Sequence, residues 1–331
     1  MQVSGEAQAD FYALQPDMVL DAVESSGVSC DGRLLALNSY ENRVYQVGVE
    51  DQGYLVAKFY RPKRWSDEQI LEEHVFSHEL AEADRPVVAP LVGENGSSLR
   101  QHLGYRFALY PRRGGRTPEL GDEDNLRWLG RQLGCIHAIG RISLFQQRLR
   151  VADEAMGAAA RDYLLGQDLI PAHVLSAWES VSRDLLVRVQ AAFDRAGHYT
   201  ELRLHGDCHP GNILWTDAGP HFVDLDDSGN GPAIQDLWML LAGDRGERTR
   251  QLSCVLEGYE QFSEFDPREL NLLEALRALR LLRFSAWIAR RWEDPAFPIA
   301  FPWFASHRYW EEQVLMLREQ MAALDEPPLS L

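Results

Sequence analysis

The segment that decides the fold is Leu204–Leu214, which reads LHGDCHPGNIL. It places Asp207 and Asn212 five residues apart on a loop that leads into an apolar run. A second acidic motif follows where the apolar pair Phe222-Val223 ends in the sequence DLDD, which begins at Asp224. A carboxylate and a carboxamide at this spacing can point at one small volume, so we expect the two motifs to act together.

The residue types of these motifs match the needs of phosphoryl transfer. Amide and carboxylate oxygens suit a hard cation such as Mg²⁺, which also binds water and substrate phosphates. The attacking hydroxyl needs an acceptor that orients it. We therefore predict Asp207 and Asp224 as catalytic residues, with Asn212 and Asp224 as Mg²⁺ ligands. The kinase catalytic loop has the same Asp–Asn spacing, although this loop reads His-Gly-Asp and the metal motif reads Asp-Leu-Asp.

Two other interpretations of these motifs remain open. His205 and Asp207 are also suited to hydrogen bonding a turn, with Asp224–Asp227 as a solvated loop. His205, Cys208 and His209 are zinc-ligand types, but they lack the second paired cluster that zinc sites usually show. Cys208 is by default a small buried hydrophobic side chain, and it would be an oxidation-sensitive switch only with a stabilised thiolate.

The N-terminal third of the chain has the pattern of a β-sheet. Apolar runs and polar turns alternate over residues 34–60, and Tyr54–Tyr60 alternates with period two. Two further strands are predicted over Val87–Val92 and Tyr105–Tyr110, and one helix over Ile70–Leu80 after the capping candidates Ser66 and Asp67.

Lys58 is the second element of the predicted site. Taken alone, a lysine on this strand would emerge on a solvated face. In a kinase N-lobe, this lysine reaches the α- and β-phosphates of ATP and pairs with a glutamate of the following helix. Glu72 and Glu73 both stand at a suitable distance along the chain. We favour Glu73 because it shares a helical face with Ile70 and Ser77, and the other glutamate remains an alternative.

The loop between the first two strands, Asn38–Asn42, occupies the place of a phosphate-covering loop. It contains no glycine, so the glycine-rich phosphate motif does not identify it. Ser39 and the loop amides are suited to donate hydrogen bonds to phosphate oxygens. A plain polar hairpin explains the segment equally well.

Beyond Pro111 the sequence becomes helical. Apolar residues recur at helical spacing over residues 126–136, 181–193 and 270–288, and a hairpin interrupts them within Leu202–Asp227. Asp236, at the expected start of a helix, is suited either to brace the catalytic loop through its backbone or to cap that helix.

The sequence therefore predicts an α+β, bilobal protein kinase-like fold. Residues 1–111 form the expected ATP-binding N-lobe, an antiparallel sheet with one helix. Residues 112–331 form the expected C-lobe, which is mainly helical and carries the catalytic loop and the metal-binding hairpin.

Composition narrows the class of protein further. The chain has 331 residues, with 33 Lys and Arg against 50 Asp and Glu, so its formal charge is −17. This balance argues against a general nucleic-acid or membrane-surface binder. The four cysteines are widely separated, and the first thirty residues lack the basic and apolar regions of a leader. We expect a cytoplasmic monomer that binds neither nucleic acid nor a membrane.

The motifs resemble those of the bacterial stress response kinase A family, in the aminoglycoside phosphotransferase and choline kinase-like superfamily. The resemblance runs over essentially the whole chain. It is carried by Asn38–Tyr45, Lys58–Pro62, Ile70–His74, Leu204–Leu214 and Phe222–Asp227.

This resemblance implies a cytoplasmic serine/threonine protein kinase that uses ATP and Mg²⁺. The family is tied to survival of envelope and oxidative stress and opposes programmed cell death. By motif, Asp207 would be the proton acceptor, Asn212 and Asp224 would bind Mg²⁺, and Ser39 would lie at the ATP site.

Two alternative functions stay open. A small-molecule kinase acting on an amino alcohol, sugar or antibiotic hydroxyl would use the same catalytic residues, and the acidic composition would suit a cationic substrate. A catalytically silent nucleotide-binding scaffold is the second alternative. The intact set of Lys58, Asp207, Asn212 and Asp224 argues against it, because a non-enzyme would have no need of all four.

Overall fold

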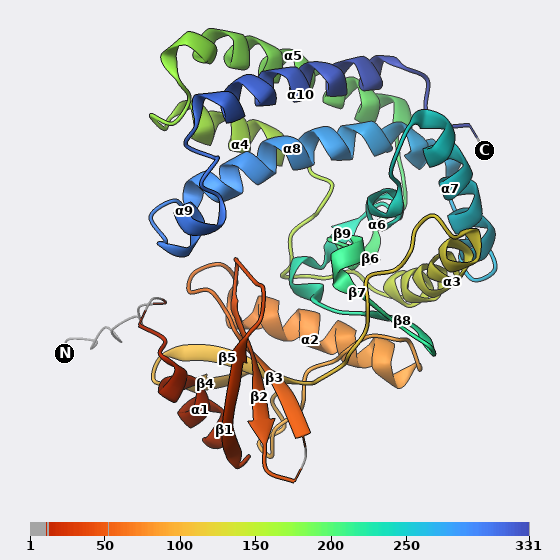
Figure 1. Cartoon of the computed structure of the whole chain (residues 1–331). Coiled ribbons are helices and arrows are strands. Elements are labelled where there is room, and N and C mark those ends of the chain that lie inside the picture. The colour runs from red at the N-terminus through yellow and green to blue at the C-terminus, as the bar shows by residue number, and fades with distance from the viewer. Residues whose placement is uncertain (1–10, 12, 52, 331) are drawn as a thin grey trace. The chain divides into compact units, whose positions relative to one another are not determined.

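The computed structural model describes residues 11, 13–51 and 53–330, whose contacts divide the chain into two compact units (Figure 1). Unit 1 comprises Met1–Pro118, Phe145–Arg148 and Pro210–Ser228, and unit 2 comprises Glu119–Leu144, Leu149–His209 and Gly229–Leu331. The functional division into an ATP-binding segment 1–111 and a catalytic segment 112–331 stays a prediction.

Unit 1 is built on a five-stranded sheet in which every neighbouring pair is antiparallel. In sheet order its strands are β1 (Cys30–Ala36), β2 (Arg43–Val49), β3 (Gly53–Phe59), β5 (Tyr105–Pro111) and β4 (Arg100–His102).

The two faces of this sheet have different partners. Helix α1 (Pro16–Glu24) packs on the face that carries Phe59 and Phe107. Helix α2 (Asp67–Glu82) contributes Ile70 to the other face, where it joins Tyr60 in a small apolar cluster. Because side chains alternate along a strand, Lys58 lies on this second face, as the alternating pattern predicted. The sheet thus buries one face against α1 and turns the lysine toward α2.

Helix α2 begins where the sequence indicated. The Ser66 side chain accepts the backbone N–H of Gln69, and the Gln69 side chain accepts the backbone N–H of Ser66, which makes a reciprocal capping box. The strand predicted over Val87–Val92 is wrong, because the segment makes only an isolated bridge from Val87 to Phe222. Pro86 and Pro90 flank this bridge and lack the N–H groups that a ladder needs.

The predicted hairpin is present, as β7 (Ile213–Thr216) and β8 (Gly219–Phe222). It follows a 3₁₀ turn, η1 (Pro210–Asn212), and precedes another, η2 (Leu225–Asp227). Phe222 donates to the carbonyl of Pro86, and Arg116 exchanges backbone hydrogen bonds with Trp215. These contacts hold the hairpin within unit 1.

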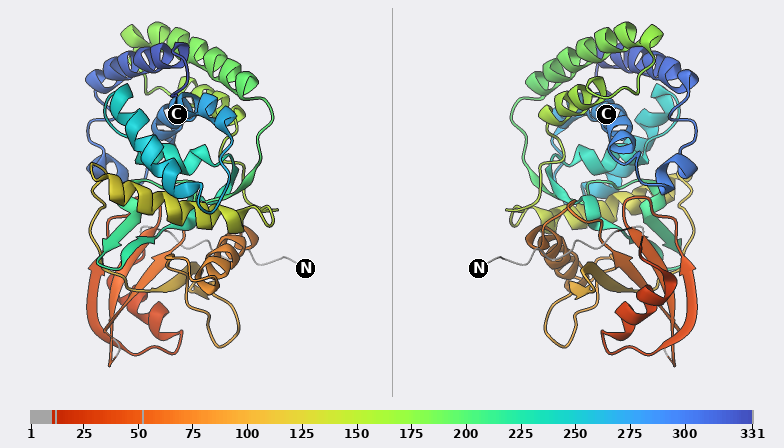
Figure 2. Two further views of the ribbon diagram at one scale, coloured as in Figure 1. Left: turned by 90° about the vertical axis from the view of Figure 1, so that its right-hand side faces the viewer. Right: turned by 90° about the vertical axis from the view of Figure 1, so that its left-hand side faces the viewer.

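Unit 2 contains the two-stranded sheet β6–β9 and is otherwise mainly helical, and Figure 2 shows its long helices from two further sides. A cluster of buried apolar residues joins the helices Ala172–Ala196 (α5), Leu273–Arg290 (α8) and His307–Asp325 (α10), with Trp178 and Trp310 edge to face. Its elements are α3 (Glu123–Gly140), α4 (Ala155–Leu165), α5 (Ala172–Ala196), β6 (Leu202–Leu204), β9 (Gly229–Gly231), α6 (Ile234–Leu237), η3 (Trp238–Leu240), α7 (Arg245–Tyr259), η4 (Pro267–Leu272), α8 (Leu273–Arg290), α9 (Ala296–Ala300) and α10 (His307–Asp325).

These elements confirm the predicted α+β fold, a small antiparallel sheet followed by a mainly helical remainder. Among the described residues, no helix combines the length and apolar character needed to cross a bilayer.

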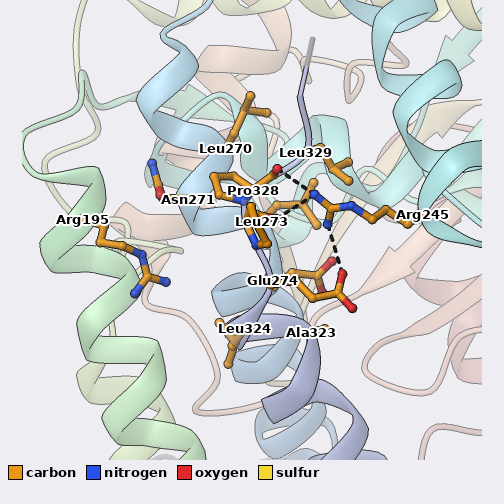
Figure 3. Close-up of a pocket in the computed structure, with 12 residues that line it drawn as sticks. Arg195, Arg245, Leu270, Asn271, Leu273, Glu274, Ala323, Leu324, Pro328 and Leu329 are labelled. Carbon is orange, nitrogen blue, oxygen red and sulfur yellow. Dashed lines mark hydrogen bonds and ion pairs between the residues drawn. The ribbon is translucent and has the colours of Figure 1, made fainter.

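The C-terminal segment is fixed to unit 2 by one arginine (Figure 3). Arg245 donates to the backbone carbonyls of Pro327 and Pro328 at 2.8 Å each and forms an ion pair with Glu326 at 3.2 Å. The cavity beneath has a volume of about 20 Å³. That is room for about one water molecule.

Candidate active site

Asp224 lies at the sharp turn after the β7–β8 hairpin. Its backbone is left-handed, with φ 60° and ψ 62°, a conformation that aspartate tolerates better than most residues. The N–H of Val223 donates to the backbone carbonyl of Asn212 at 3.0 Å. The two predicted metal ligands are therefore held in one hairpin, Asn212 before its first strand and Asp224 after its second.

Lys58 contacts Asp224 directly. Its Nζ lies 2.6 Å from Oδ1 of Asp224 and 3.2 Å from Oδ1 of Asp226, and its side chain is only 7% exposed. Burial alone would lower the pKa of Lys58, but the two carboxylates outweigh it and hold that pKa well above the ordinary value. Lys58 is thus a buried, charged group that contacts the acidic motif after the hairpin. A lysine that binds phosphate has to be charged in this way.

Asp226 is a buried anion that the sequence analysis quoted but gave no role. Besides Lys58, its carboxylate contacts Arg64 Nη1 at 2.8 Å and Asn42 Nδ2 at 3.2 Å, and Arg148 donates to its backbone carbonyl. Burial would raise the pKa of Asp226, but the charges of Lys58, Arg64 and Arg148 hold it well below the ordinary range. Asp226 therefore ties four distant segments of unit 1 to the hairpin.

The two candidate glutamates of α2 have separate partners. Glu72 accepts the backbone N–H groups of residues 146–148 at 2.5, 2.9 and 2.9 Å. Glu73 is buried and accepts a hydrogen bond from Ser77 at 3.0 Å. Burial raises the pKa of Glu73 to about 7, against the opposing charge of Lys58. The ion pairs given above join Lys58 to Asp224 and Asp226, so its pairing with Glu73 stays a prediction.

The glycine-free loop at 38–42 is held by an arginine. Arg61 donates from its guanidinium to the carbonyls of Tyr40 and Glu41, at 3.0 and 2.8 Å, and its backbone N–H donates to Asn42 Oδ1 at 3.1 Å. Hydrogen bonds from Arg61 thus hold the backbone of a loop that contains no glycine. Ser39 is half-buried within it, and its contact with ATP stays a prediction.

Asp207 lies in unit 2, directly after β6. The preceding Gly206 has φ 84°, a left-handed conformation that favours glycine. Arg280 Nη1 contacts Asp207 Oδ1 at 2.5 Å, and His209 Nε2 lies 3.4 Å from Oδ2. Burial would raise the pKa of Asp207, but the His209 hydrogen bond and the Arg280 charge hold it well below its usual range. It is therefore an ionised carboxylate, able to accept a hydroxyl hydrogen bond.

Asp236 braces the loop that carries Asp207, which confirms the first of the two roles expected for it. Its two carboxylate oxygens accept the backbone N–H groups of His205 and Gly206 at 2.8 and 2.9 Å. His137 Nε2 lies 3.1 Å from the same carboxylate, and both side chains are fully buried. This network fixes the loop backbone before any substrate binds.

Cys208 is fully buried beside the predicted base. Burial and the charges of Asp236 and Asp207 hold its pKa well above the ordinary value, which disfavours the thiolate. Neither a zinc ligand nor an oxidation-sensitive thiol is favoured in that environment, because both need the thiolate.

Long-range pairing explains what the sequence analysis missed. Asp226 lies within the DLDD motif but was given no role. The other residues without a role reach the predicted site from distant segments, and they are Asn42, Arg64, Arg148, His137 and Arg280. The one local indication was the run of acidic residues in DLDD, since a carboxylate that becomes buried, as Asp226 does, needs cations to offset it.

Comparison with known proteins identifies the family. The family model described as phosphotransferase enzyme family matches residues 33–273. Stress response kinase A of Escherichia coli O157:H7 is 48% identical over 321 residues, 97% of each chain. The serine/threonine protein kinase RdoA of Salmonella typhimurium strain LT2 is 47% identical over 321 residues, again 97% of each chain.

A solved structure shares the fold at low sequence identity. An amicoumacin kinase in complex with AMP-PNP and Ca²⁺ has a TM-score of 0.71 at 17% identity, over 95% of this chain and 94% of that one. The chain described here thus belongs to the phosphotransferase enzyme family, within which it groups with the stress response kinase A proteins, and it is an enzyme that transfers phosphate.

Proposed function

We propose that this enzyme is an ATP- and Mg²⁺-dependent serine/threonine protein kinase of the bacterial stress response. The observation that carries the proposal is the ion pair of the buried Lys58 with Asp224, on the hairpin that also carries Asn212. The name of the 47% identical RdoA relative supports a protein acceptor. The sequence features described above support a cytoplasmic monomer.

The chemistry of the ligand set fits magnesium. Asn212 and Asp224 offer one amide and one carboxylate oxygen, and Mg²⁺ commonly takes few protein oxygens together with water and phosphate. When bound, the ion neutralises charge on the β- and γ-phosphates of ATP. Lys58 Nζ lies 2.6 Å from Oδ1 of Asp224, so the lysine stands beside the carboxylate that would hold the ion.

The other predicted site residues take the roles that their motifs indicate. Lys58 binds the α- and β-phosphates, and Glu73 keeps it in place from α2. Ser39 and the loop around it contact the phosphates. Asp207 accepts the proton of the acceptor hydroxyl, whose oxygen bonds to the γ-phosphorus while the bond from that phosphorus to the bridging oxygen breaks and ADP departs.

A small-molecule kinase is the second candidate, and the solved structures that share the fold favour it. These include kinases for amicoumacin and for aminopropanol, the latter with a TM-score of 0.70 at 16% identity over 94% of this chain and 98% of that one. Likeness at this identity shows the fold, so the acceptor has to be determined by assay.

Labelled ATP distinguishes the candidates. The enzyme is incubated with a bacterial protein pool and, separately, with a panel of amino alcohols, sugars and antibiotics. We expect label on Ser or Thr of protein, and Asp207→Ala should lower that rate by about 10²–10⁴-fold while the protein stays folded. Asp217→Ala, at an exposed hairpin turn, is the matched control and should retain activity. Label on a small alcohol alone would reject the protein kinase assignment.

A further inference from the structure

Helix α8, which Figure 1 labels, carries a row of arginines, one of which contacts the predicted base Asp207. Arg277, Arg280 and Arg283 recur every three residues, so they lie along one side of the helix. Arg280 and Arg283 are exposed, and Arg277 is half-buried. All three belong to unit 2, as does Asp207.

The contacts of the row place Asp207 at its middle. Arg280 holds the Asp207 carboxylate at 2.5 Å while its own side chain stays 46% exposed. Arg277, one turn earlier, has its guanidinium carbon 5.9 Å from the centre of a Trp238 ring. Arg283, one turn later, donates to the backbone carbonyl of Val151 at 3.4 Å. Along the helix, the residue that contacts Asp207 thus has one arginine three positions before it and another three positions after it.

The local charge of this surface is opposite to that of the chain. The protein carries a formal charge of −17, which by itself would attract cationic acceptors. Glu274, the carboxylate nearest the start of the row, lies 3.8 Å from Arg277 but 2.5 Å from Arg248, so most of its charge is engaged elsewhere. The surface around Asp207 thus favours anionic groups.

An aromatic surface continues the same side of α8. Phe284 stacks on Trp287 with ring centres 5.8 Å apart and on Trp303 at 6.5 Å. Phe284 is 40% exposed and Trp303 is 41% exposed. Exposed, stacked rings beside arginines offer an apolar contact and a charged contact to one ligand.

We propose that this side of α8 is the acceptor-binding surface and that it selects an acidic peptide segment. Carboxylates or phosphates that flank the Ser or Thr would pair with Arg277 and Arg283, and an apolar side chain would rest on Phe284 and Trp303. The inference rests on the proposed kinase function and names its substrate class.

The length of the surface favours a peptide over a metabolite. Ten residues separate Arg277 from Trp287, which corresponds to about 15 Å of helix at about 1.5 Å per residue. An extended peptide covers that distance with about four or five residues. A small hydroxy acid would reach Asp207 and one arginine, and would leave the rings uncovered.

The test compares matched peptides on charge-reversed enzymes. Three peptides share one central serine and carry flanking Asp and Glu, flanking Lys and Arg, or flanking Ala. The double variant Arg277→Glu, Arg283→Glu is compared with Arg318→Glu, the same charge reversal at an exposed position of α10. Peptide phosphorylation and peptide-free ATP hydrolysis are measured for each protein.

We expect the native enzyme to prefer the acidic peptide in kcat/KM by about tenfold or more, and the double variant to reverse that preference. Its peptide-free ATP hydrolysis should remain unchanged, and Arg318→Glu should behave as the native enzyme does. Equal rates for the three peptides, equal losses in both variants, or transfer only to small anionic alcohols such as glycerate would each overturn the proposal.

Direct binding separates this proposal from the kinase function itself. Fluorescence anisotropy of the labelled acidic peptide measures docking without turnover. If the native protein turned over no ATP, the kinase assignment would fail, while peptide binding that the double variant loses would still support the surface. Equal binding of the acidic and basic peptides would reject the surface even in an active kinase.

Discussion

The molecule stabilises its functional carboxylates in two different ways. In unit 1 the DLDD segment, Asp224–Asp227, is surrounded by cations, with Lys58 and Arg64 within 3.2 Å of its side chains. In unit 2 the carboxylate of Asp236 is held by two backbone N–H groups and by His137. The DLDD segment balances charge with charge, whereas the surroundings of Asp236 solvate a charge with fixed dipoles.

This difference separates the part that can exchange its partners from the part that stays fixed. A lysine ammonium on a flexible stem can leave a carboxylate when a metal ion or a phosphate competes for it. Backbone amides cannot leave without a change in the fold, so they hold their geometry through the reaction. We therefore expect substitutions in the first region to alter nucleotide binding, and substitutions in the second to alter the placement of Asp207.

The largest effect is expected for Lys58→Met. Phosphoryl transfer should fall by about 10³-fold, because the phosphates lose their buried cation. Unfolding should become easier by about 3–5 kcal/mol, since buried Asp226 loses a partner. The control is Lys63→Met, which replaces an exposed lysine in the loop after β3 and should change neither the transfer rate nor the stability. Urea unfolding and labelled-ATP assays measure both, and a fully active Lys58→Met enzyme would contradict the charge-balance argument.

Asp236→Asn should have the next largest effect. The asparagine oxygen can accept only one of the backbone N–H groups of His205 and Gly206. The NH₂ group would face the other N–H, donor against donor, so the backbone of the catalytic loop should shift. We expect kcat to fall by about 10–100-fold with KM for ATP nearly constant. Asp244→Asn, at the N-cap of α7, is the control, because asparagine caps as well as aspartate. An equal change in kcat and KM would argue that Asp236 also governs nucleotide binding.

A smaller effect should distinguish the two glutamates of α2. Glu73→Gln removes a charge that acts on Lys58, and should raise KM for ATP about fivefold. Glu72→Gln weakens hydrogen bonds to residues 146–148, and should lower the free energy of unfolding by about 1–3 kcal/mol with KM within about twofold. The reverse assignment of KM and stability would make Glu72 the partner of Lys58.

Local patterns predicted the parts of the structure that depend on neighbouring residues. The alternation of β3 placed Lys58 on the face away from α1, and the sequence from Ser66 to Gln69 indicated the start of α2. The turn sequence at 217–220 indicated the hairpin, although β8 ends at Phe222 and Asp224 leaves the strand conformation. These features follow from side-chain periodicity and from turn chemistry.

Partners that come from distant segments could not be predicted in the same way. Arg280 is 73 residues from Asp207 along the chain, and Arg148 is 78 residues from Asp226. No local pattern marks an arginine that will approach a particular carboxylate. The strand expected at Val87–Val92 failed for a different, local reason, because Pro86 and Pro90 lack the N–H groups of a strand ladder.

The smallest effect on phosphoryl transfer is expected for Glu269→Gln. This variant tests the surroundings of Asp236 through the pH dependence of the free energy of unfolding. Glu269 is buried and accepts the N–H of Ile234, at the start of the helix that carries Asp236, at 2.9 Å. Burial raises the pKa of Glu269 from 4.5 to about 7. Between these two values the folded protein keeps a proton on Glu269 that the unfolded chain has released, so stability must fall as pH rises through this window.

Each pKa unit between the folded and the unfolded protein corresponds to about 1.4 kcal/mol, so the free energy of unfolding should fall by a few kcal/mol by neutral pH. Glutamine carries no titrating proton. The stability of the variant relative to the native protein should therefore improve steadily from pH 4.5 to pH 7 and stay constant above, as urea unfolding would measure. A constant difference across this range would show that Glu269 is as well compensated as Asp226, whose cations hold its pKa low, and that the two regions solvate their carboxylates alike.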